Sequence, residues 1–247
     1  MKNELCIVSY SWGIYNDYAP LYAYSILQQY PEYYVKLITP SKFTKKQKES
    51  FSILPNQRFE IIENYKGGEN KSARWLLPKA IFDNFKYGYI GDIDFIIAKE
   101  NPSLCNSHIQ HCKENSLPYS NKIRPVKNVL KMTGLHFIEV EPYYDRMDSI
   151  ILDYSKRNLK KIHNETVLYH MVTEAFEKPE GQFRPHHGIH LGLIRINSKM
   201  NLYVRWKDYA SSVLPLLNTE TYEVIKSNMH PKISSQLNKT KEILKGI

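Results

Sequence analysis

Two aspartates with one residue between them, Asp92 and Asp94, stand between two apolar runs. The first run, Tyr87 to Ile90, has the aromatic and β-branched content of a short buried strand. Because side chains at positions i and i+2 of a strand point the same way, we expect both carboxylates on one face where this strand ends. Neighbouring carboxylates repel each other unless a cation compensates, and oxygen ligands suit Mg²⁺ or Mn²⁺. The spacing predicts a divalent metal site; the alternative is a turn with two solvated aspartates.

A second group with ligand chemistry is a histidine-rich stretch. His186, His187 and His190 lie among two glycines, Gly188 and Gly192. Neutral imidazole is a good ligand for metals such as Mn²⁺, and carboxylates combined with imidazole favour such a metal over Ca²⁺. We expect His190, and after it His187, to complete the metal site of the two aspartates. The alternative is that these are ordinary surface or core histidines.

A third group combines cysteine and histidine: Cys105, His108, His111 and Cys112. The chain has no second pair of such residues at zinc-finger spacing, so structural zinc is the weaker interpretation. Three cysteines in the whole chain fit a reducing compartment.

The composition is that of a folded protein. The chain has 247 residues, of which 42% are hydrophobic and 13% aromatic, and this content argues against disorder over most of the length. No apolar run approaches the roughly eighteen residues that a membrane-spanning helix needs. The apolar run near the start of the sequence is too short for a signal peptide, so we expect an intracellular protein.

The formal charge is +9, from 34 Lys and Arg against 25 Asp and Glu. Such an excess is compatible with nucleic acid, with an anionic membrane surface or with phosphate-bearing small molecules. The sequence contains no zinc finger, no RNP-like run and no glycine-rich P-loop, which argues against the common nucleic-acid-binding modules.

The N-terminal part of the chain alternates between strand and helix patterns, which is typical of an α/β fold: a Rossmann-like, mixed, mainly parallel sheet flanked by helices. In open sheets of this kind, ligands bind at the carboxyl ends of the strands. The loop after Ser9 and the turn with the two aspartates should therefore lie along one rim. The expected strands are residues 6–10, 34–38, 59–62 and 87–90, and the expected helices are residues 18–29, 45–51 and 73–84.

The later part of the chain has a different pattern. Residues 101–127 are polar and contain three prolines, and a polar loop follows Cys112. We expect a strand over 134–141. Helices are expected over 147–156 and 166–176, the second capped by Asn164 with an acid in its first turn. From residue 201 onward the sequence predicts a helical, basic region.

The order of these pieces resembles the GT-A glycosyltransferases, of the glycogenin and lipopolysaccharide galactosyltransferase type. The matching pieces span most of residues 5–195 and are residues 9–27, 71–78, 92–94, 164–168 and 187–192. The resemblance implies that Asp94 ligates Mn²⁺ directly and that Asp92 contacts the metal or the donor ribose. It also implies that the late histidine, His190 or His187, is the third ligand.

The resemblance further implies contacts with a nucleotide-sugar donor. Arg74 would lie near the diphosphate or the donor sugar, and Tyr10 near the base. With them we expect Ser9, Asp92 and Ile93 to line the donor. A metal neutralises the leaving diphosphate as a Lewis acid, and arginine adds a bidentate phosphate contact.

An inverting reaction also needs a carboxylate that takes the proton of the acceptor. Glu139, Glu141 and Glu165 are candidates, and we select Glu165 and Glu141, together with Asp92, as catalytic residues. The alternative is that each glutamate is structural. The aromatic and acidic run at residues 134–144 either lines an acceptor pocket or forms an ordinary core strand.

We therefore expect a metal-dependent glycosyltransferase that moves a sugar from a nucleotide sugar, foremost a UDP-sugar, to a saccharide or lipid-linked acceptor. Mn²⁺ or Mg²⁺ would be its cofactor and bacterial capsule or lipopolysaccharide synthesis its setting. Residues 1–195 would form the nucleotide-sugar-binding and catalytic domain, and residues 196–247 a C-terminal helical extension. We expect it in the cytoplasm, with peripheral contact to anionic membrane and no nucleic-acid partner.

Two alternatives remain. A sugar-1-phosphate nucleotidyltransferase shares the sheet and the metal, but it normally has a glycine-rich, basic N-terminal loop, and residues 9–17 contain one glycine and no Lys or Arg. A non-catalytic, basic nucleic-acid-binding protein would explain the charge, and it predicts salt-sensitive binding to oligonucleotides.

Overall fold

The computed structural model describes residues 3–179, 187–196 and 202–247. Contacts divide the chain into two compact units whose segments alternate along the sequence. The expected division into residues 1–195 and 196–247 is a functional one and stays a prediction. Unit 1 consists of Met1–Tyr10, Tyr65–Asp92 and Pro102–Pro185, and unit 2 of Ser11–Asn64, Ile93–Asn101 and His186–Ile247.

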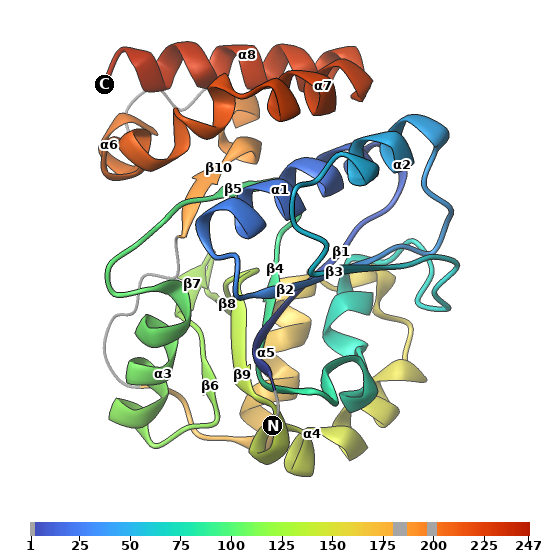
Figure 1. The fold of residues 1–247 in the computed structure, drawn as a ribbon. Helices are drawn as coiled ribbons and strands as arrows, with labels where there is room; N and C mark the ends of the chain where they lie inside the picture. The colour runs from blue at the N-terminus through green and yellow to red at the C-terminus, as the bar shows by residue number, and fades with distance from the viewer. Residues whose placement is uncertain (1–2, 180–186, 197–201) are drawn as a thin grey trace. The chain divides into compact units, whose positions relative to one another are not determined.

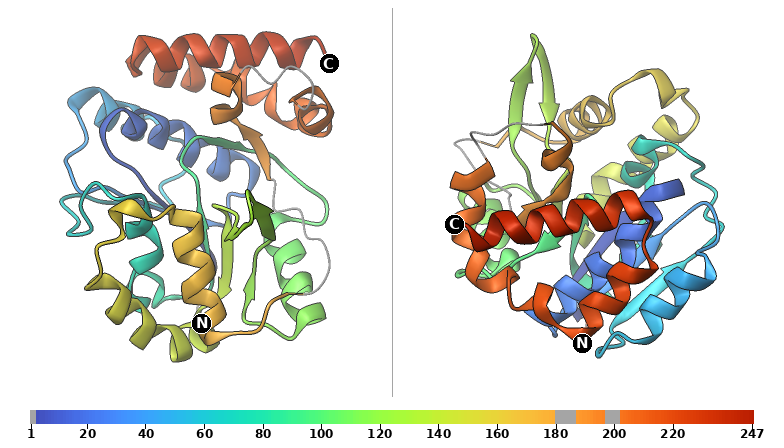
Figure 2. Two further views of the ribbon diagram at one scale, coloured as in Figure 1. Left: turned by 180° about the vertical axis from the view of Figure 1, so that it is seen from behind. Right: turned by 90° about the horizontal axis from the view of Figure 1, so that it is seen from above.

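In unit 1, strands pair in the order β1-β4-β9-β6 (Figure 1). β1 and β4 are parallel, whereas β9 is antiparallel to both β4 and β6. A separate antiparallel hairpin, β7–β8, is visible in Figure 2 as two neighbouring arrows. The strands are β1 (Asn3–Tyr10), β4 (Phe85–Gly91), β6 (Tyr119–Ser120), β7 (Ile123–Val126), β8 (Val129–Met132) and β9 (His136–Glu139).

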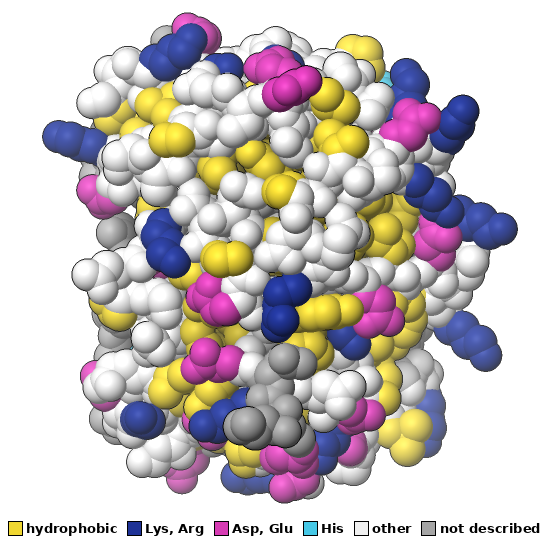
Figure 3. All heavy atoms as spheres, viewed as in Figure 1, with side chains coloured by type: hydrophobic (Ala, Val, Ile, Leu, Met, Phe, Trp, Pro, Cys, Tyr) yellow, Lys and Arg dark blue, Asp and Glu magenta, His cyan; other side chains and the backbone are white. Residues whose placement is uncertain are grey.

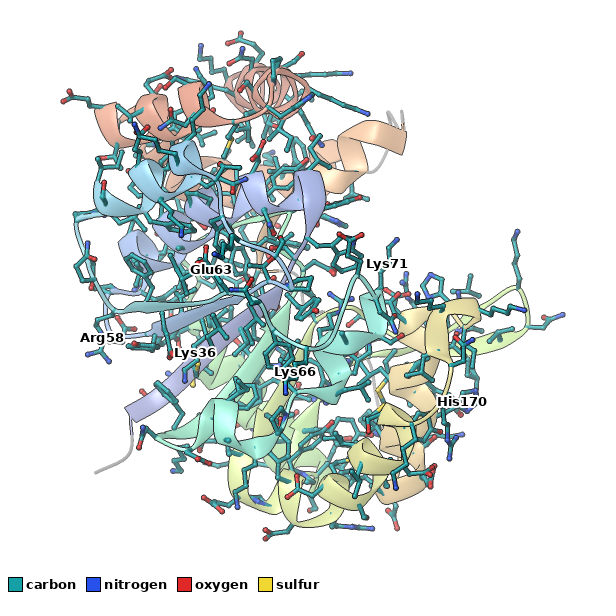
Figure 4. The ribbon with its side chains drawn as sticks, turned by 90° about the vertical axis from the view of Figure 1, so that its right-hand side faces the viewer. Lys36, Arg58, Glu63, Lys66, Lys71 and His170 are labelled. Atoms are coloured by element: carbon teal, nitrogen blue, oxygen red, sulfur yellow. The ribbon has the colours of Figure 1, made fainter. Side chains whose placement is uncertain are left out.

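The helices of unit 1 cover this sheet and support the hairpin. α4 packs against β4 and β9, and α5 packs against α4 and β8. His170 projects from the exposed face of α5 (Figure 4). The helices are η2 (Lys71–Leu76), η3 (Lys79–Phe82), α3 (Leu104–Asn115), α4 (Val140–Ser155), η4 (Leu159–Lys161) and α5 (Asn164–Ala175).

The core of unit 1 forms around β1. Four successive residues, Leu5 to Val8, are each at most 1% exposed, so both faces of the strand are covered. A continuous apolar run is what a parallel strand between two helical layers requires. Phe137 of β9 stacks on Tyr87 of β4, with ring centroids 5.3 Å apart, and extends the core across the antiparallel pair.

Unit 2 contains two short strand pairs and most of the C-terminal helices. β2 and β3 are parallel, and β5 and β10 are antiparallel. α1 packs against β2, β5 and α7, while α8 packs against α6 and α7 (Figure 1). The elements are η1 (Gly13–Tyr18), α1 (Ala19–Gln29), β2 (Tyr34–Ile38), α2 (Lys45–Ser52), β3 (Phe59–Ile62), β5 (Phe95–Ile97), β10 (Gly188–His190), η5 (Leu191–Ile196), α6 (Leu202–Val213), η6 (Leu216–Asn218), α7 (Glu220–Asn228) and α8 (Pro231–Lys245).

Side-chain hydrogen bonds tie α1 to the C-terminal helices. The Tyr24 hydroxyl lies 2.8 Å from the Thr219 hydroxyl, and Gln29 Nε2 donates to the carbonyl of Ser212 at 2.8 Å. α1 is buried continuously from Ala19 to Leu27, as expected of a helix enclosed on several sides. α1, α6 and α7 are therefore parts of one core.

Much of the expected arrangement is confirmed. The strands expected at residues 6–10, 34–38, 59–62 and 87–90 are β1, β2, β3 and β4, and the early helices are α1 and α2. Parallel pairs followed by antiparallel β9 and β6 give the mixed, mainly parallel sheet flanked by helices. The region after residue 201 is helical, and α5 is the helix expected over residues 166–176.

Four expectations were wrong. The cap expected at Asn164 is one residue off, because the His163 side chain caps α5. The helix expected over residues 73–84 is two short 3-10 helices, because Pro78 lies between them and cannot continue a helix. The polar stretch over residues 101–127, where no helix was expected, contains α3, which starts at a Ser103 cap. The strand expected over residues 134–141 ends at residue 139, and the helix expected from residue 147 begins at Val140 as α4. Pro142 is tolerated because it falls in the first turn of α4, where its missing N–H is not needed.

Among the described residues, no helix is long and apolar enough to cross a membrane. On the face drawn in Figure 3, Lys and Arg side chains are interspersed with Asp and Glu. Nucleic-acid binding would favour a single basic patch. The positive charge on that face is not gathered into one.

Candidate active site

Asp92 follows directly after β4, and its carboxylate accepts a charge-assisted hydrogen bond from Arg74, from Nη1 to Oδ1. η2 presents this arginine, and the Asn70 side chain caps η2 by accepting from the Ser72 N–H at 3.0 Å. Arg74 is 8% exposed, and its guanidinium carbon lies 4.2 Å from the centre of the Trp75 ring. An ion pair and a cation–π contact therefore hold the guanidinium in place.

The backbone of Gly134 lies directly against this ion pair. A Cβ at Gly134 would lie 2.5 Å from Asp92 Oδ2 and 2.9 Å from Arg74 Nη2, so a larger residue does not fit. Asn121 fixes the preceding residue, because its Oδ1 accepts from Thr133 N at 3.0 Å and from Thr133 Oγ1 at 2.7 Å. The sequence interpretation missed both Gly134 and Asn121.

The second carboxylate of the motif, Asp94, lies in unit 2, directly before β5 begins. β5 pairs with β10 so that His190 stands opposite Phe95, and Leu191 N donates to the Asp94 carbonyl at 2.9 Å. This pairing places Asp94 Oδ1 3.4 Å from His190 Nε2. The His190 ring stacks on Phe95 with centroids 4.5 Å apart, which fixes the orientation of the imidazole.

Gly188 permits the close approach of β10 to β5. Its φ is +142°, and a Cβ there would lie 2.0 Å from the Ile96 carbonyl oxygen. Glycine alone accepts that conformation and that distance without strain. The placement of His190 beside Asp94 therefore depends on a glycine two residues earlier.

The Asp94–His190 pair fits a divalent cation. Two ligands at right angles on Mg²⁺, each about 2.1 Å away, lie about 3 Å apart, close to the observed 3.4 Å. A Cβ at Gly192 would lie 2.7 Å from His190 Nε2 and 2.8 Å from Asp94 Oδ2, so the glycine keeps space open beside both groups. Carboxylate with imidazole is a donor set for Mn²⁺-class metals.

Within residues 3–179, 187–196 and 202–247, no group of three or more His, Cys, Asp or Glu side chains is arranged to hold a metal. An ion at Asp94 and His190 would take further ligands from water and substrate. That is the usual arrangement for Mg²⁺ in phosphate-transfer sites, where one or two carboxylates act with substrate phosphates.

His187 lies at the opposite end of β10. Its Nδ1 is 2.5 Å from Glu100 Oε2, and Tyr209 donates its hydroxyl to the other oxygen of Glu100 at 2.8 Å. Burial, and then the Glu100 charge, raise the pKa of Tyr209, so the phenol stays protonated. The structure brings His190 to Asp94 and directs His187 to Glu100; the ligand role of either histidine stays a prediction.

The residues expected along the donor are largely enclosed. Ser9 is 1% exposed and donates its hydroxyl to the Gly91 carbonyl at 3.0 Å. The Tyr10 hydroxyl donates to the Gly68 carbonyl at 2.6 Å, and burial raises the pKa of Tyr10 to about 12. Ile93 is buried, with its backbone in the turn between the two aspartates. The Ser9 and Tyr10 hydroxyls thus make internal hydrogen bonds.

Both glutamates selected as catalytic are ion-paired. Glu165, in the first turn of α5, accepts two hydrogen bonds from Arg124 at 3.0 and 2.8 Å. Glu141, in the first turn of α4, accepts from Lys79 at 2.5 Å, and this contact raises the pKa of Lys79. Glu141 therefore lies in a helix and not, as expected, in a strand. The geometry favours structural roles, and the catalytic roles stay predictions.

The cysteine and histidine group falls on α3. His108 Nδ1 lies 2.8 Å from the Ser120 hydroxyl, and its ring stacks on Phe137 with centroids 4.8 Å apart. Both cysteines are buried thiols, and burial raises the pKa of Cys112. These side chains pack the core of unit 1, and the described residues hold no metal-binding group there.

No protein-family model and no curated protein matches this sequence. Among solved structures, the chain is similar to the glycosyltransferase GlyE of Streptococcus pneumoniae TIGR4, with a TM-score of 0.51 and 10% identity over 97% of this chain and 64% of that chain. This likeness shows a shared fold. The expected resemblance to glycosyltransferases is confirmed at that level.

Two further solved structures match parts of the chain. The galactosyltransferase LgtC, in complex with donor and acceptor sugar analogues, has a TM-score of 0.44 and 11% identity over 67% of this chain and 69% of that chain. A 4-diphosphocytidyl-2C-methyl-D-erythritol synthase from Anaerococcus prevotii DSM 20548 has a TM-score of 0.48 and 10% identity over 71% and 86%.

Proposed function

We propose that this protein is a metal-dependent glycosyltransferase that moves a sugar from a nucleotide-sugar donor, foremost a UDP-sugar, to a saccharide or lipid-linked acceptor. The observation that carries the proposal is the contact of Asp94, directly before β5, with His190. The fold shared with a glycosyltransferase supports the same reaction class.

Asp94 and His190 would hold Mn²⁺ or Mg²⁺, which when bound neutralises charge on the leaving diphosphate. Phe95 keeps the His190 ring in one orientation, and Gly192 leaves space beside the two ligand groups. Arg74 holds Asp92 in place, and of the two contacts that the resemblance implies for Asp92 we propose the one with the donor ribose. The neutral Tyr10 phenol holds the loop at Gly68 and does not add negative charge.

The setting we propose is bacterial capsule or lipopolysaccharide synthesis, in the cytoplasm or at the inner face of the membrane. The excess of 34 basic over 25 acidic residues supports attraction to anionic lipid or to a diphosphate-bearing acceptor. The same charge also attracts nucleotide sugars, which are anions.

A donor screen tests the proposal. The protein is incubated with Mn²⁺ and a panel of UDP-, GDP-, CDP- and dTDP-sugars, with and without saccharide acceptors. We expect release of a nucleoside diphosphate from one donor, dependent on the metal. Electron paramagnetic resonance of Mn²⁺ measures metal binding separately. No nucleoside diphosphate from any donor would overturn the proposal, and formation of pyrophosphate from a nucleoside triphosphate would favour the nucleotidyltransferase instead.

A further inference from the structure

A cavity of about 380 Å³ lies in unit 2 between η1 and α8. Two tyrosines, Tyr15 and Tyr18, come from η1, with ring centroids 6.1 Å apart. α8 contributes Lys232, Gln236 and Lys239. The cavity therefore combines aromatic surface with amide and ammonium groups.

Hydrogen bonds hold the walls of this cavity in place. The Tyr18 hydroxyl donates to Gln236 Oε1 at 2.6 Å, which joins η1 to α8 in the middle of the cavity. Asp17 Oδ2 accepts from the His230 N–H at 2.7 Å, which joins η1 to the start of α8. The cavity is thus built from two elements that are bonded to each other at two points.

The lysines of α8 differ in their partners. Lys241 and Lys245 each lie within 3.4 Å of a glutamate oxygen, of Glu223 and Glu242 respectively. The ammonium groups of Lys232 and Lys239 make no ion pair or hydrogen bond with any part of the chain that the structure describes. The two lysines without a carboxylate partner are the two that line the cavity.

Their spacing places them on one side of the helix. Lys232, Gln236 and Lys239 stand at positions i, i+4 and i+7, which form one stripe of an α-helix. At 1.5 Å per residue, the two lysines are separated by about 10 Å along the helix axis. The stripe lies beside the buried apolar stripe of Ile233 and Leu237.

The cavity adjoins the proposed metal ligands within the same unit. Gln236 Nε2 donates to the carbonyl of Leu191, the residue after His190. The N–H of Leu191 donates to the Asp94 carbonyl at 2.9 Å. One residue therefore links the cavity wall to both Asp94 and His190.

From this arrangement we infer that the cavity is the acceptor subsite and that it takes a saccharide carrying an anionic group, a phosphate or a carboxylate. This inference rests on the proposed function. Tyrosine rings offer flat apolar surface to a sugar ring, and lysine ammonium groups hydrogen-bond phosphate and carboxylate oxygens. Two ammonium groups separated along the helix suit an elongated acceptor with charge along its length.

The test replaces both cavity lysines in the full chain, as K232Q/K239Q, with K241Q/K245Q on the same helix as the matched control. Three acceptors are compared: a uronic-acid oligosaccharide, a neutral oligosaccharide of equal length, and a polyprenyl-diphosphate-linked sugar in phosphatidylcholine vesicles. We expect the KM for the charged acceptors to rise about tenfold or more in K232Q/K239Q, because two charge-assisted contacts are lost. The KM for the neutral acceptor, and every KM of the control, should stay unchanged.

The two charged acceptors identify the anion. A larger effect on the lipid-linked sugar assigns the cavity to phosphate, and a larger effect on the uronic-acid oligosaccharide assigns it to carboxylate. Equal KM changes for charged and neutral acceptors, or no change for any of them, would overturn the inference.

Binding measurements separate this inference from the proposed function. Hydrolysis of the donor by the wild-type protein without acceptor reports on the proposed function alone. Isothermal titration with the uronic-acid oligosaccharide reports on the cavity alone, and we expect binding that K232Q/K239Q loses and K241Q/K245Q keeps. Absence of binding of any charged acceptor to the wild-type protein would refute the acceptor subsite even if the donor is hydrolysed.

Discussion

Asp92 and Asp94 are two residues apart, yet the protein surrounds them with different chemistry. Asp92 is paired with Arg74, a permanently charged group that is itself packed on Trp75 and closed in by Gly134. Asp94 is next to His190, and Gly192 keeps space beside them. The first carboxylate lies against a guanidinium, whereas the second lies against an imidazole in a setting that could hold an ion.

Two aspartates of one short motif can therefore have different roles. A guanidinium cannot give up its proton and remains a competitor for the Asp92 carboxylate. An imidazole can instead offer a nitrogen lone pair to a metal, and His190 would do so beside Asp94. The comparison predicts that changes around Asp92 act mainly on stability and that changes around Asp94 act mainly on metal binding.

The largest effect is expected for Asp94→Asn. Loss of a charged metal ligand should lower Mn²⁺-dependent release of nucleoside diphosphate on the order of a thousandfold. Mn²⁺ binding, measured by electron paramagnetic resonance, should weaken in parallel, while the urea midpoint changes little. Asp92→Asn is the matched variant: an equal loss of Mn²⁺ binding there would break the distinction between the two aspartates.

Arg74→Met should lower the free energy of unfolding by about 2 kcal/mol, because the partly buried Asp92 loses its partner. Urea denaturation measures this change. The double variant Arg74→Met with Asp92→Leu should recover part of the stability, since no unpaired charge remains. A double variant as unstable as the sum of its single changes would show that the ion pair is not the cause.

Gly134→Ala should also cost about 2 kcal/mol, because the added methyl group would overlap Asp92 Oδ2 and displace the ion pair. The control is Gly246→Ala, where a Cβ would meet nothing closer than 3.6 Å. In Gly192→Ala the methyl group should instead weaken Mn²⁺ binding. A loss of Mn²⁺ binding in Gly134→Ala without a loss of stability would reverse the two roles.

A buried histidine beside Trp75 also predicts that the free energy of unfolding depends on pH. His136 lies edge-on to Trp75, 6.2 Å between ring centroids, and burial lowers its pKa to about 3. The unfolded chain binds a proton on this histidine below about pH 6.5, and the folded protein does not. Stability should therefore be constant above that pH and fall below it, by about 1.4 kcal/mol per pH unit.

Urea denaturation across this pH range measures the slope for the wild-type protein and for His136→Asn. His170→Gln, which removes an exposed histidine of α5, is the control and should keep the wild-type slope (Figure 4). An unchanged slope in His136→Asn would assign the pH dependence to other groups.

The smallest effect is expected for Glu141→Gln. The Lys79–Glu141 pair is at the surface, with the glutamate side chain 51% exposed, and exposed pairs add little to stability. Neither the urea midpoint nor the release of nucleoside diphosphate should change measurably. A large loss of turnover at unchanged stability would instead identify Glu141 as the general base.

The sequence predicted the elements whose signals are local. β1, β2 and β4 were predictable from apolar runs, and α5 from the acid in its first turn, Glu165. α3 was missed because its stretch is polar overall, although Ser103 followed by apolar or weakly polar residues at Leu104, Cys105, His108 and Cys112 has helical spacing.

The candidate site was predictable only in part, because its contacts are not local. The sequence pointed to Asp94 and to two histidines, with His190 ranked before His187, but it could not show which of them lies beside Asp94. The choice is made by the register of β5 and β10, two strands of three residues each that carry almost no signal of their own. Gly188 was the available clue, since a glycine within a strand often marks a close backbone approach.

The alternation of the two units along the chain has a consequence for synthesis on the ribosome. Residues 11–64 of unit 2 emerge early, but their partners, such as Thr219 for Tyr24 and Gln236 for Tyr18, emerge only near the end. Contacts between such distant parts of a chain form slowly, and the apolar face of α1 stays without its native cover while translation continues. We therefore expect nascent chains to depend on chaperones until the last helix has been made.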